Sequence, residues 1–296
     1  MKIVQSYWSK PANKRTDLNK SDRNLGGWLE SKYNYMSWAL SCLQFKKYYR
    51  QVELVTDRQG YDLLINKLEL PYTKVDLALD RMDDYHPDLW ALGKIFAYQL
   101  QAEPFVHADG DVFIWGAFSK ALETSAVFAQ NLEHSNVYYE KSYTAINQHF
   151  TYIPQVILDT RKHRSDFTSI NAGILGGNNI AFIQEYTRTA LDFVNRNLDR
   201  LTHIDIGWFN CIFEQYLFYC LSCEKGVKIH YELSNINSDF DGIIDFTGVP
   251  SNTRYLHALA GYKKSRVITE MVEFRLKTEH PDYYYKIIRL LQNQSL

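Results

Sequence analysis

Cysteine is scarce in this sequence, with only four among 296 residues: Cys42, Cys211, Cys220 and Cys223. The last two are separated by two residues inside an apolar, helix-like stretch, and no second CxxC pair is present. A tetrahedral zinc site of the usual spacing is therefore not indicated. We expect buried free thiols in a reducing compartment.

An excess of either charge is also lacking, because 33 Lys and Arg side chains face 34 Asp and Glu, for a net charge of −1. No overall positive field favours nucleic acid or an anionic membrane as a partner. A local cluster such as Lys263, Lys264 and Arg266 could still bind a phosphate group. The charge balance thus argues against a nucleic-acid partner and leaves small anions open.

Long hydrophobic runs are missing as well. The longest apolar stretch, at residues 208–223, is interrupted by Asn210, Glu214 and Gln215, which makes it too polar to span a bilayer. Residues 1–8 (MKIVQSYW) lack the apolar core of a signal peptide and look like an opening strand. We expect a cytoplasmic protein without a transmembrane segment, either free or peripheral to a membrane.

Tyrosine and tryptophan, by contrast, are plentiful, with 22 and 6 residues. Amphipathic rings suit sugar recognition, because they stack on C–H faces while their polar tips form hydrogen bonds. A tyrosine-rich core is the plainer interpretation. With 46% hydrophobic and 23% charged residues, the chain reads as an ordinary globular protein.

Apolar strand-like and helix-like segments alternate along the whole chain, without a repeat or a Pro/Gly/Ser-rich linker. The expected strands are 3–7, 52–56, 74–79, 105–114 with a central turn, 126–131, 168–176, 227–233 and 255–259; the expected helices are 28–48, 61–68, 89–100, 181–198, 208–220 and 282–291. This order predicts a single α/β domain with a Rossmann-like, mostly parallel sheet flanked by helices. We expect residues 1–115 to bind a nucleotide and residues 116–296 to face a second substrate.

The segment FVHADGDVF, residues 105–113, places two carboxylates at the end of a predicted strand. In open α/β sheets, ligands bind beyond the carboxyl ends of the strands. Asp109 and Asp111, separated by Gly110 on a turn, can present oxygens to one divalent cation and leave positions for phosphates. Such a cation would neutralise a departing diphosphate. Ser6, Tyr7 and Asp57, at the ends of the first two strands, are candidates to bind a base and ribose.

This segment resembles the Asp-x-Asp strand of retaining GT-A glycosyltransferases, especially those related to glycogenin and the bacterial lipopolysaccharide galactosyltransferases. Four further blocks occur in the order of that family, the first before this segment and three after it: WALGKIF (90–96), NAGIL (171–175), DIGWFN (205–210) and HALAGYKK (257–264). Each block is short, and their shared order over most of the chain carries the resemblance.

The resemblance implies a GT-A fold and transfer of a sugar, with retention, from a nucleotide diphosphate, UDP being favoured, to a glycan, lipid-linked or peptide acceptor. It implies Mn²⁺ or Mg²⁺ bound by Asp109, Asp111 and His257, donor charge bound by Lys94, Gly261 and Lys263, and a sugar positioned by Asn171 and Asp205. The family's usual Leu before the first Asp is Ala108 here, its Gln after Asp205 is Ile206, and the His-to-Gly spacing is one residue longer. These departures indicate a divergent branch and affect the donor-sugar contacts more than the metal.

Plainer roles stand beside these expectations. His257 could be a core histidine, Lys263 a solvated lysine, Asp205 a helix N-cap and Glu214 a buried hydrogen-bonded acid or an acceptor-site group. A nucleotidyltransferase is one alternative, although residues 9–15 contain no glycine. A non-catalytic carbohydrate- or nucleotide-binding protein is another. We also expect residues 133–168 to form acceptor loops and residues 9–25 a lid.

Overall fold

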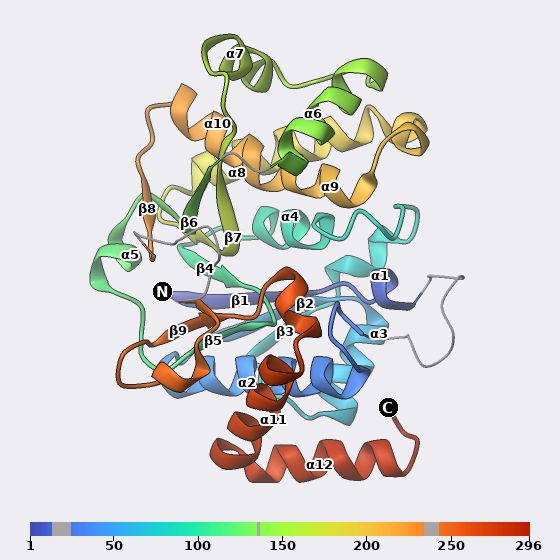
Figure 1. Ribbon diagram of the computed structural model, residues 1–296, viewed down its shortest axis with the longest axis vertical. Helices are drawn as coiled ribbons and strands as arrows, with labels where there is room; N and C mark the ends of the chain where they lie inside the picture. The colour runs from blue at the N-terminus through green and yellow to red at the C-terminus, as the bar shows by residue number, and fades with distance from the viewer. Residues whose placement is uncertain (14–24, 135–136, 234–242) are drawn as a thin grey trace. The chain divides into compact units, whose positions relative to one another are not determined.

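The computed structural model describes residues 1–13, 25–134, 137–233 and 243–296 (Figure 1). The chain divides into two compact units, each built from separate stretches of sequence. Unit 1 comprises Met1–Pro87, Ala108–Ala117 and Ile236–Leu296, and unit 2 comprises Asp88–His107 and Phe118–Asn235. The C-terminal stretch therefore belongs to the same unit as the N-terminal one.

Within the described ranges, seven strands form one sheet in the order β3-β2-β1-β4-β7-β6-β8, and β5 pairs with β9. The strands are β1 (Lys2–Tyr7), β2 (Val52–Thr56), β3 (Lys74–Asp76), β4 (Phe105–Ala108), β5 (Val112–Ile114), β6 (Val127–His134), β7 (Thr168–Gly177), β8 (Ile229–Tyr231) and β9 (Tyr255–His257). β1 pairs with β2, β2 with β3 and β6 with β8 in parallel, whereas β6 and β7 are antiparallel. The expected α/β class, a mostly parallel sheet flanked by helices, is confirmed.

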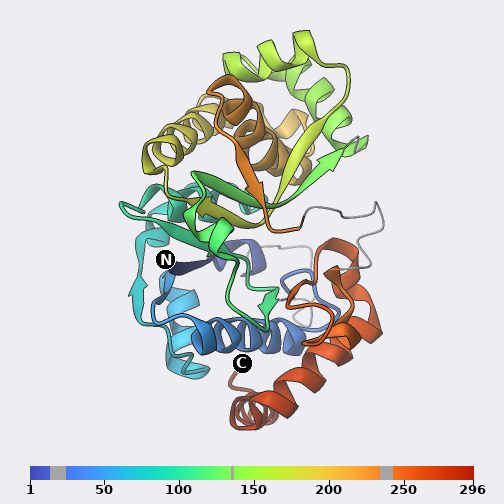
Figure 2. The same ribbon diagram turned by 90° about the vertical axis from the view of Figure 1, so that its left-hand side faces the viewer.

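The core of unit 1 surrounds one long helix. The helices of this unit are α1 (Lys10–Asn13), α2 (Ser31–Tyr48), α3 (Arg58–Tyr61), α11 (Arg266–Glu279) and α12 (Pro281–Gln292). α2 is buried along an uninterrupted run from Tyr33 to Phe45, because it contacts β2 and β5 as well as α11 and α12. Figure 2 shows α11 crossing beside α2. Because α2 is enclosed on all sides, its polar and apolar residues are not divided between two faces, which explains its weak amphipathic pattern.

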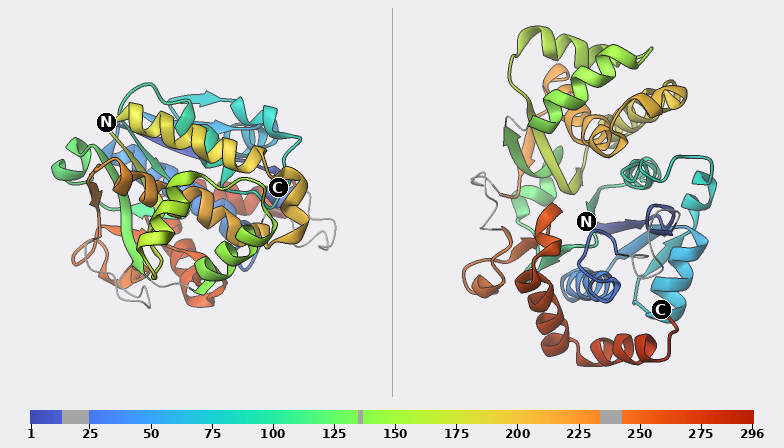
Figure 3. Two further views of the ribbon diagram at one scale, coloured as in Figure 1. Left: turned by 90° about the horizontal axis from the view of Figure 1, so that it is seen from above. Right: turned by 45° about the vertical axis from the view of Figure 1, so that its right-hand side comes forward.

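Unit 2 is organised around β7, whose ten residues are all buried. Its helices are α4 (Leu92–Gln99), α5 (Lys120–Thr124), α6 (Val137–His149), α7 (Gln155–His163), α8 (Ile180–Asn195), α9 (Ile206–Cys211) and α10 (Leu217–Glu224). α10 packs on β7 and on α7, while α6 packs on α9 (Figure 3). α8 begins where the Asn179 side chain accepts a hydrogen bond from the backbone N–H of Phe182 (3.1 Å), so Asn179 is the N-cap of this helix.

Several expectations from the sequence were wrong. The described part of residues 133–168 contains the end of β6 and helices α6 and α7 where acceptor loops were expected, because Tyr139, Ser142, Ile146, Val156 and Ile157 supply buried positions on these helices. Helix α11 was missed because its apolar residues are mixed with charged ones: Ile268, Val272 and Leu276 are buried, but Val267 and Phe274 are exposed, so the sequence shows no single apolar face. The strand expected at 74–79 ends at Asp76, and a 3₁₀ turn, Ala78–Met82, follows. Most of the proposed lid, residues 14–24, lies outside the described residues.

The apolar segment at 206–224 is not one regular helix either. A π-helical turn, Ile212–Tyr216, separates α9 from α10. Its extra residue per turn places Glu214 inside the unit. Among the described helices, none is long and apolar enough to cross a membrane. All four cysteines are free; Cys42 and Cys220 are buried as expected, whereas Cys211 is partly exposed and Cys223 is exposed.

Candidate metal site

The Asp109-Gly110-Asp111 turn connects β4 to β5, as the sequence predicted. The backbone N–H of Val112 donates to the Asp109 carbonyl (3.1 Å) and closes the turn. Two serines of α2 hold its carbonyls: the Ser37 hydroxyl donates to Gly110 (2.8 Å) and the Ser41 hydroxyl to Val112 (2.6 Å). The turn is therefore fixed to the buried helix of unit 1, which restricts where the two carboxylates can point.

Gly110 is required at this turn for steric reasons. A Cβ atom on Gly110 would lie 2.4 Å from the ring of Trp38, closer than carbon atoms approach in proteins. Trp38 is buried and packs edge-on against Tyr7 at 5.1 Å between ring centroids, so it has little room to move. The glycine thus allows the turn to lie directly on α2.

We expect Gly110→Ala to lower the free energy of unfolding by about 1–3 kcal/mol, because the added methyl group displaces the turn or Trp38. The matched control is Gly261→Ala, whose Cβ would meet no atom within 4 Å and which should change stability by less than about 0.5 kcal/mol. Urea unfolding of both variants measures this difference. If the two variants had equal free energies of unfolding, Trp38 could move to admit the methyl group without loss of stability.

His257 reaches the turn through strand pairing. β9 runs antiparallel to β5 with His257 opposite Val112, and the Ala258 N–H donates to the Asp111 carbonyl (3.0 Å). The His257 Nε2 atom lies 3.4 Å from Asp111 Oδ1. Asp111 and His257 are both buried. One ligand atom each from Asp109, Asp111 and His257 lie within 4.8 Å of one another.

These separations fit a single divalent cation. Ligand atoms about 2.0–2.6 Å from one ion can lie at most about 4–5 Å apart. Two carboxylates and an imidazole are ligands that Mn²⁺ and Mg²⁺ accept, and three ligands leave positions open for other molecules. The structure therefore brings together the three residues that the sequence analysis selected.

Lys263, on the 3₁₀ turn Ala260–Lys264, forms an ion pair with Asp111 through Nζ and Oδ2. Burial alone would raise the pKa of the Asp111 carboxyl, but the charges of Lys263 and His257 and their hydrogen bonds hold this pKa well below its usual range. Asp111 is thus ionised at neutral pH. Gly261, on the same turn, is exposed and has no steric need to be glycine.

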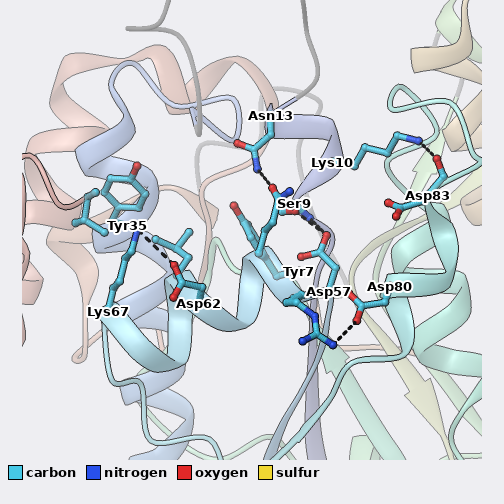
Figure 4. Close-up of a pocket in the computed structure, with 14 residues that line it drawn as sticks. Tyr7, Ser9, Lys10, Asn13, Tyr35, Asp57, Asp62, Lys67, Asp80 and Asp83 are labelled. Atoms are coloured by element: carbon cyan, nitrogen blue, oxygen red, sulfur yellow. Dashed lines mark hydrogen bonds and ion pairs between the residues drawn. The ribbon is translucent and has the colours of Figure 1, made fainter.

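A second feature of unit 1 is a cavity of about 700 Å³ at the carboxyl ends of β1 and β2 (Figure 4). Tyr7 and Asp57 line it, whereas Ser6 lies on β1 outside its lining. The Asp57 carboxylate accepts hydrogen bonds from the N–H and hydroxyl of Ser9 (2.8 and 2.7 Å) and from the N–H of Gly60 (2.7 Å). Asp57 therefore shapes the cavity wall by fixing the chain after β1 and capping α3.

The Tyr7 hydroxyl is buried and makes no hydrogen bond with any of the residues that the structure describes. Burial, with smaller effects of Tyr35 and Asp57, raises its pKa, so it stays protonated and able to donate. A buried polar group of this kind usually has a partner.

The remaining predicted residues belong to unit 2, where each has a partner. The Lys94 ammonium donates to the Ala172 carbonyl (3.0 Å) and pairs with Glu214 Oε1 (2.7 Å). Glu214 is fully buried and also accepts from the Tyr98 hydroxyl (3.2 Å), which supports the interpretation of Glu214 as a hydrogen-bonded core acid. Lys94 therefore holds β7 and the π-helical turn together.

Asn171 and Asp205 are also engaged. The Asn171 amide donates to Glu133 Oε1 (2.8 Å) and its oxygen accepts from the Gly173 N–H (2.9 Å). Asp205 accepts from the Trp208 N–H (3.0 Å) as the N-cap of α9, which is the plainer role considered for it. The sequence analysis missed Glu133, a buried acid on β6. Its signal was a carboxylate at the end of an otherwise uncharged strand.

The fold and this site define an α/β protein whose first unit carries a carboxylate–histidine cluster with the geometry of a divalent-cation site. The chain belongs to DUF6734, a family of unknown function whose model matches residues 1–290. No curated protein matches the sequence.

Proposed function

We propose that this chain is a metal-dependent glycosyltransferase with a GT-A fold, which transfers a sugar from a nucleotide diphosphate, UDP being favoured, to an acceptor hydroxyl. The observation that carries the proposal is the convergence of Asp109, Asp111 and His257 within 4.8 Å. Asp109 and Asp111 directly follow the carboxyl end of β4, and His257 lies on β9. Ligands of open α/β sheets bind beyond the carboxyl ends of the strands.

Different residues of the site would bind the cation and the diphosphate. Asp109, Asp111 and His257 would hold the cation, which when bound neutralises charge on the diphosphate as a Lewis acid. The Lys263 ammonium, next to Asp111, would add a second positive charge for a phosphate oxygen. Together they would stabilise the charge that develops as the bond to the sugar breaks.

The cavity at the ends of β1 and β2 supports a nucleoside as the other part of the donor. Its volume of about 700 Å³ is within the range of small-molecule sites. Ring surfaces of Tyr7 and Tyr35 line it beside polar groups such as Ser9 and Asn13. Cavity and metal cluster are both parts of unit 1.

The resemblance to retaining GT-A enzymes supports retention of configuration. The sugar-positioning roles of Asn171 and Asp205 rest on this resemblance alone, since both residues belong to unit 2. The Lys94 ammonium is already paired with Glu214. Under this proposal its role is therefore to fix the Ala172 carbonyl, next to Asn171 on β7. Glycan, lipid-linked and peptide acceptors all remain compatible with the chemistry of a hydroxyl nucleophile.

The experiment is calorimetric titration of UDP into the protein with Mn²⁺ and then with EDTA, followed by assays of UDP release from UDP-sugars. We expect UDP to bind with Mn²⁺ and to lose most of this affinity in EDTA, because the cation links the diphosphate to the three ligands. Binding without any turnover would favour the non-catalytic nucleotide-binding alternative. If UDP and the GDP, CDP and dTDP analogues all failed to bind with metal, the proposal would be wrong.

A further inference from the structure

Lys263 occupies the same carboxylate that the proposed cation needs. Its ammonium pairs with Oδ2 of Asp111, while His257 Nε2 lies 3.4 Å from Oδ1. Both oxygens of this buried carboxylate are therefore engaged by groups of the chain itself. A cation bound between Asp109, Asp111 and His257 would share the Asp111 carboxylate with the Lys263 ammonium. In a buried site these two positively charged groups repel each other strongly.

The backbone of Lys263 is fixed, so only its side chain can respond. The Leu29 N–H donates to the Lys263 carbonyl (3.2 Å), and Gly26 and Gly27 adopt positive φ angles of 55° and 86° next to it. A Cβ on Gly27 would lie 3.4 Å from Lys263 Cδ, so this glycine segment packs against the lysine stem.

The ammonium also has a second neighbour on this segment. Lys263 Nζ lies 3.5 Å from the Gly26 carbonyl oxygen, beside the ring of Trp28 at 5.9 Å from its centroid. The lysine head can therefore turn from Asp111 towards the 26–28 segment or towards solvent, to which 19% of its side chain is exposed. A nearby anion would stabilise it in its new position.

We propose that Lys263 is an internal counter-cation that makes this site bind a divalent cation and a diphosphate together, in preference to the cation alone. The inference rests on the proposed function, because it assumes that a diphosphate is the anion. A free cation must displace the Lys263 ammonium from Asp111, which leaves the ammonium without an anionic partner. A cation–diphosphate complex brings the phosphate oxygens that take over the ammonium, so that each positive charge keeps an anionic neighbour.

The test compares the wild type with Lys263→Met, and uses Lys264→Met as the matched control because Lys264 is the exposed neighbour on the same turn. Electron paramagnetic resonance of Mn²⁺ measures binding of the metal alone, and calorimetry measures binding of the preformed Mn²⁺–pyrophosphate complex. Thermal melting checks that each variant is folded.

We expect Lys263→Met to bind Mn²⁺ alone about 10-fold or more tightly than the wild type, because the competing charge is removed. The same variant should bind the pyrophosphate complex more weakly than the wild type does, and Lys264→Met should match the wild type in both. Equal Mn²⁺ affinity of Lys263→Met and the wild type would overturn the inference and leave the proposed function standing. Failure of all three folded proteins to bind Mn²⁺, with or without pyrophosphate, would refute the metal site itself.

Discussion

Asp111→Asn is expected to weaken Mn²⁺-dependent binding of UDP by at least about 100-fold, more than the loss of an outer-shell partner of a metal ligand usually costs. The substitution keeps the shape of the side chain but removes the charge that His257 and Lys263 surround. A neutral amide is a poorer ligand for a hard cation, and one of its two positions becomes an N–H₂ donor that repels it. Calorimetry with and without EDTA measures the effect.

The matched control is Asp245→Asn in the same unit. The Asp245 carboxylate is exposed and accepts from the Thr247 N–H (2.9 Å) as a local cap, and it is not one of the three cluster residues. This variant should bind UDP and Mn²⁺ as the wild type does. Metal-dependent binding retained in Asp111→Asn would show that the Asp-Gly-Asp turn is structural.

The strand–turn–strand around Asp109 and Asp111 was predictable because both sides of the turn are short apolar runs, which become buried strands. The α/β class followed in the same way from alternating segments. His257 lies 257 − 111 = 146 residues from Asp111 in the sequence. Neither composition nor periodicity joins such distant positions, and only the order of blocks shared with a known family indicated that β9 would lie beside β5.

The sequence did not predict which acidic side chains Lys94 and Lys263 would contact. Lys94 was expected to face a donor phosphate, but its ammonium pairs with Glu214 because a π-helical turn brings that acid inward. A single inserted residue in a helix leaves almost no trace in the apolar pattern. The contact of Lys263 with Asp111 likewise depends on how the 3₁₀ turn packs against the segment at residues 26–29.

The helices α6, α7 and α11 show a different limit. Polar and charged residues are mixed with the apolar ones, and Val137 of α6 and Phe274 of α11 are exposed, so that the sequences do not show one clear apolar face. Burial of one narrow face against α9, α10 and α2 stabilises them. Helices that depend on tertiary packing in this way carry only a weak local signal.

Lys94→Met is expected to lower the free energy of unfolding by about 3–5 kcal/mol, the usual cost of removing one partner from a buried ion pair. Glu214 is fully buried and would keep a charge without its nearest cation, and the Ala172 carbonyl would lose its donor. Urea unfolding measures the loss. Binding of Mn²⁺ to the cluster of unit 1 should stay unchanged in the folded variant, since none of the three ligands is altered.

The double variant Lys94→Met/Glu214→Gln separates charge from packing. Glutamine leaves an oxygen for the Tyr98 hydroxyl, which donates to Glu214 at 3.2 Å, but carries no charge to bury. We therefore expect the double variant to be more stable than Lys94→Met alone, because the uncompensated carboxylate is the largest part of the cost. If the double variant were the less stable of the two, the role of Lys94 would lie in its bond to the Ala172 carbonyl and not in neutralising Glu214. In that case β7, with Asn171 on it, would be the element that Lys94 positions.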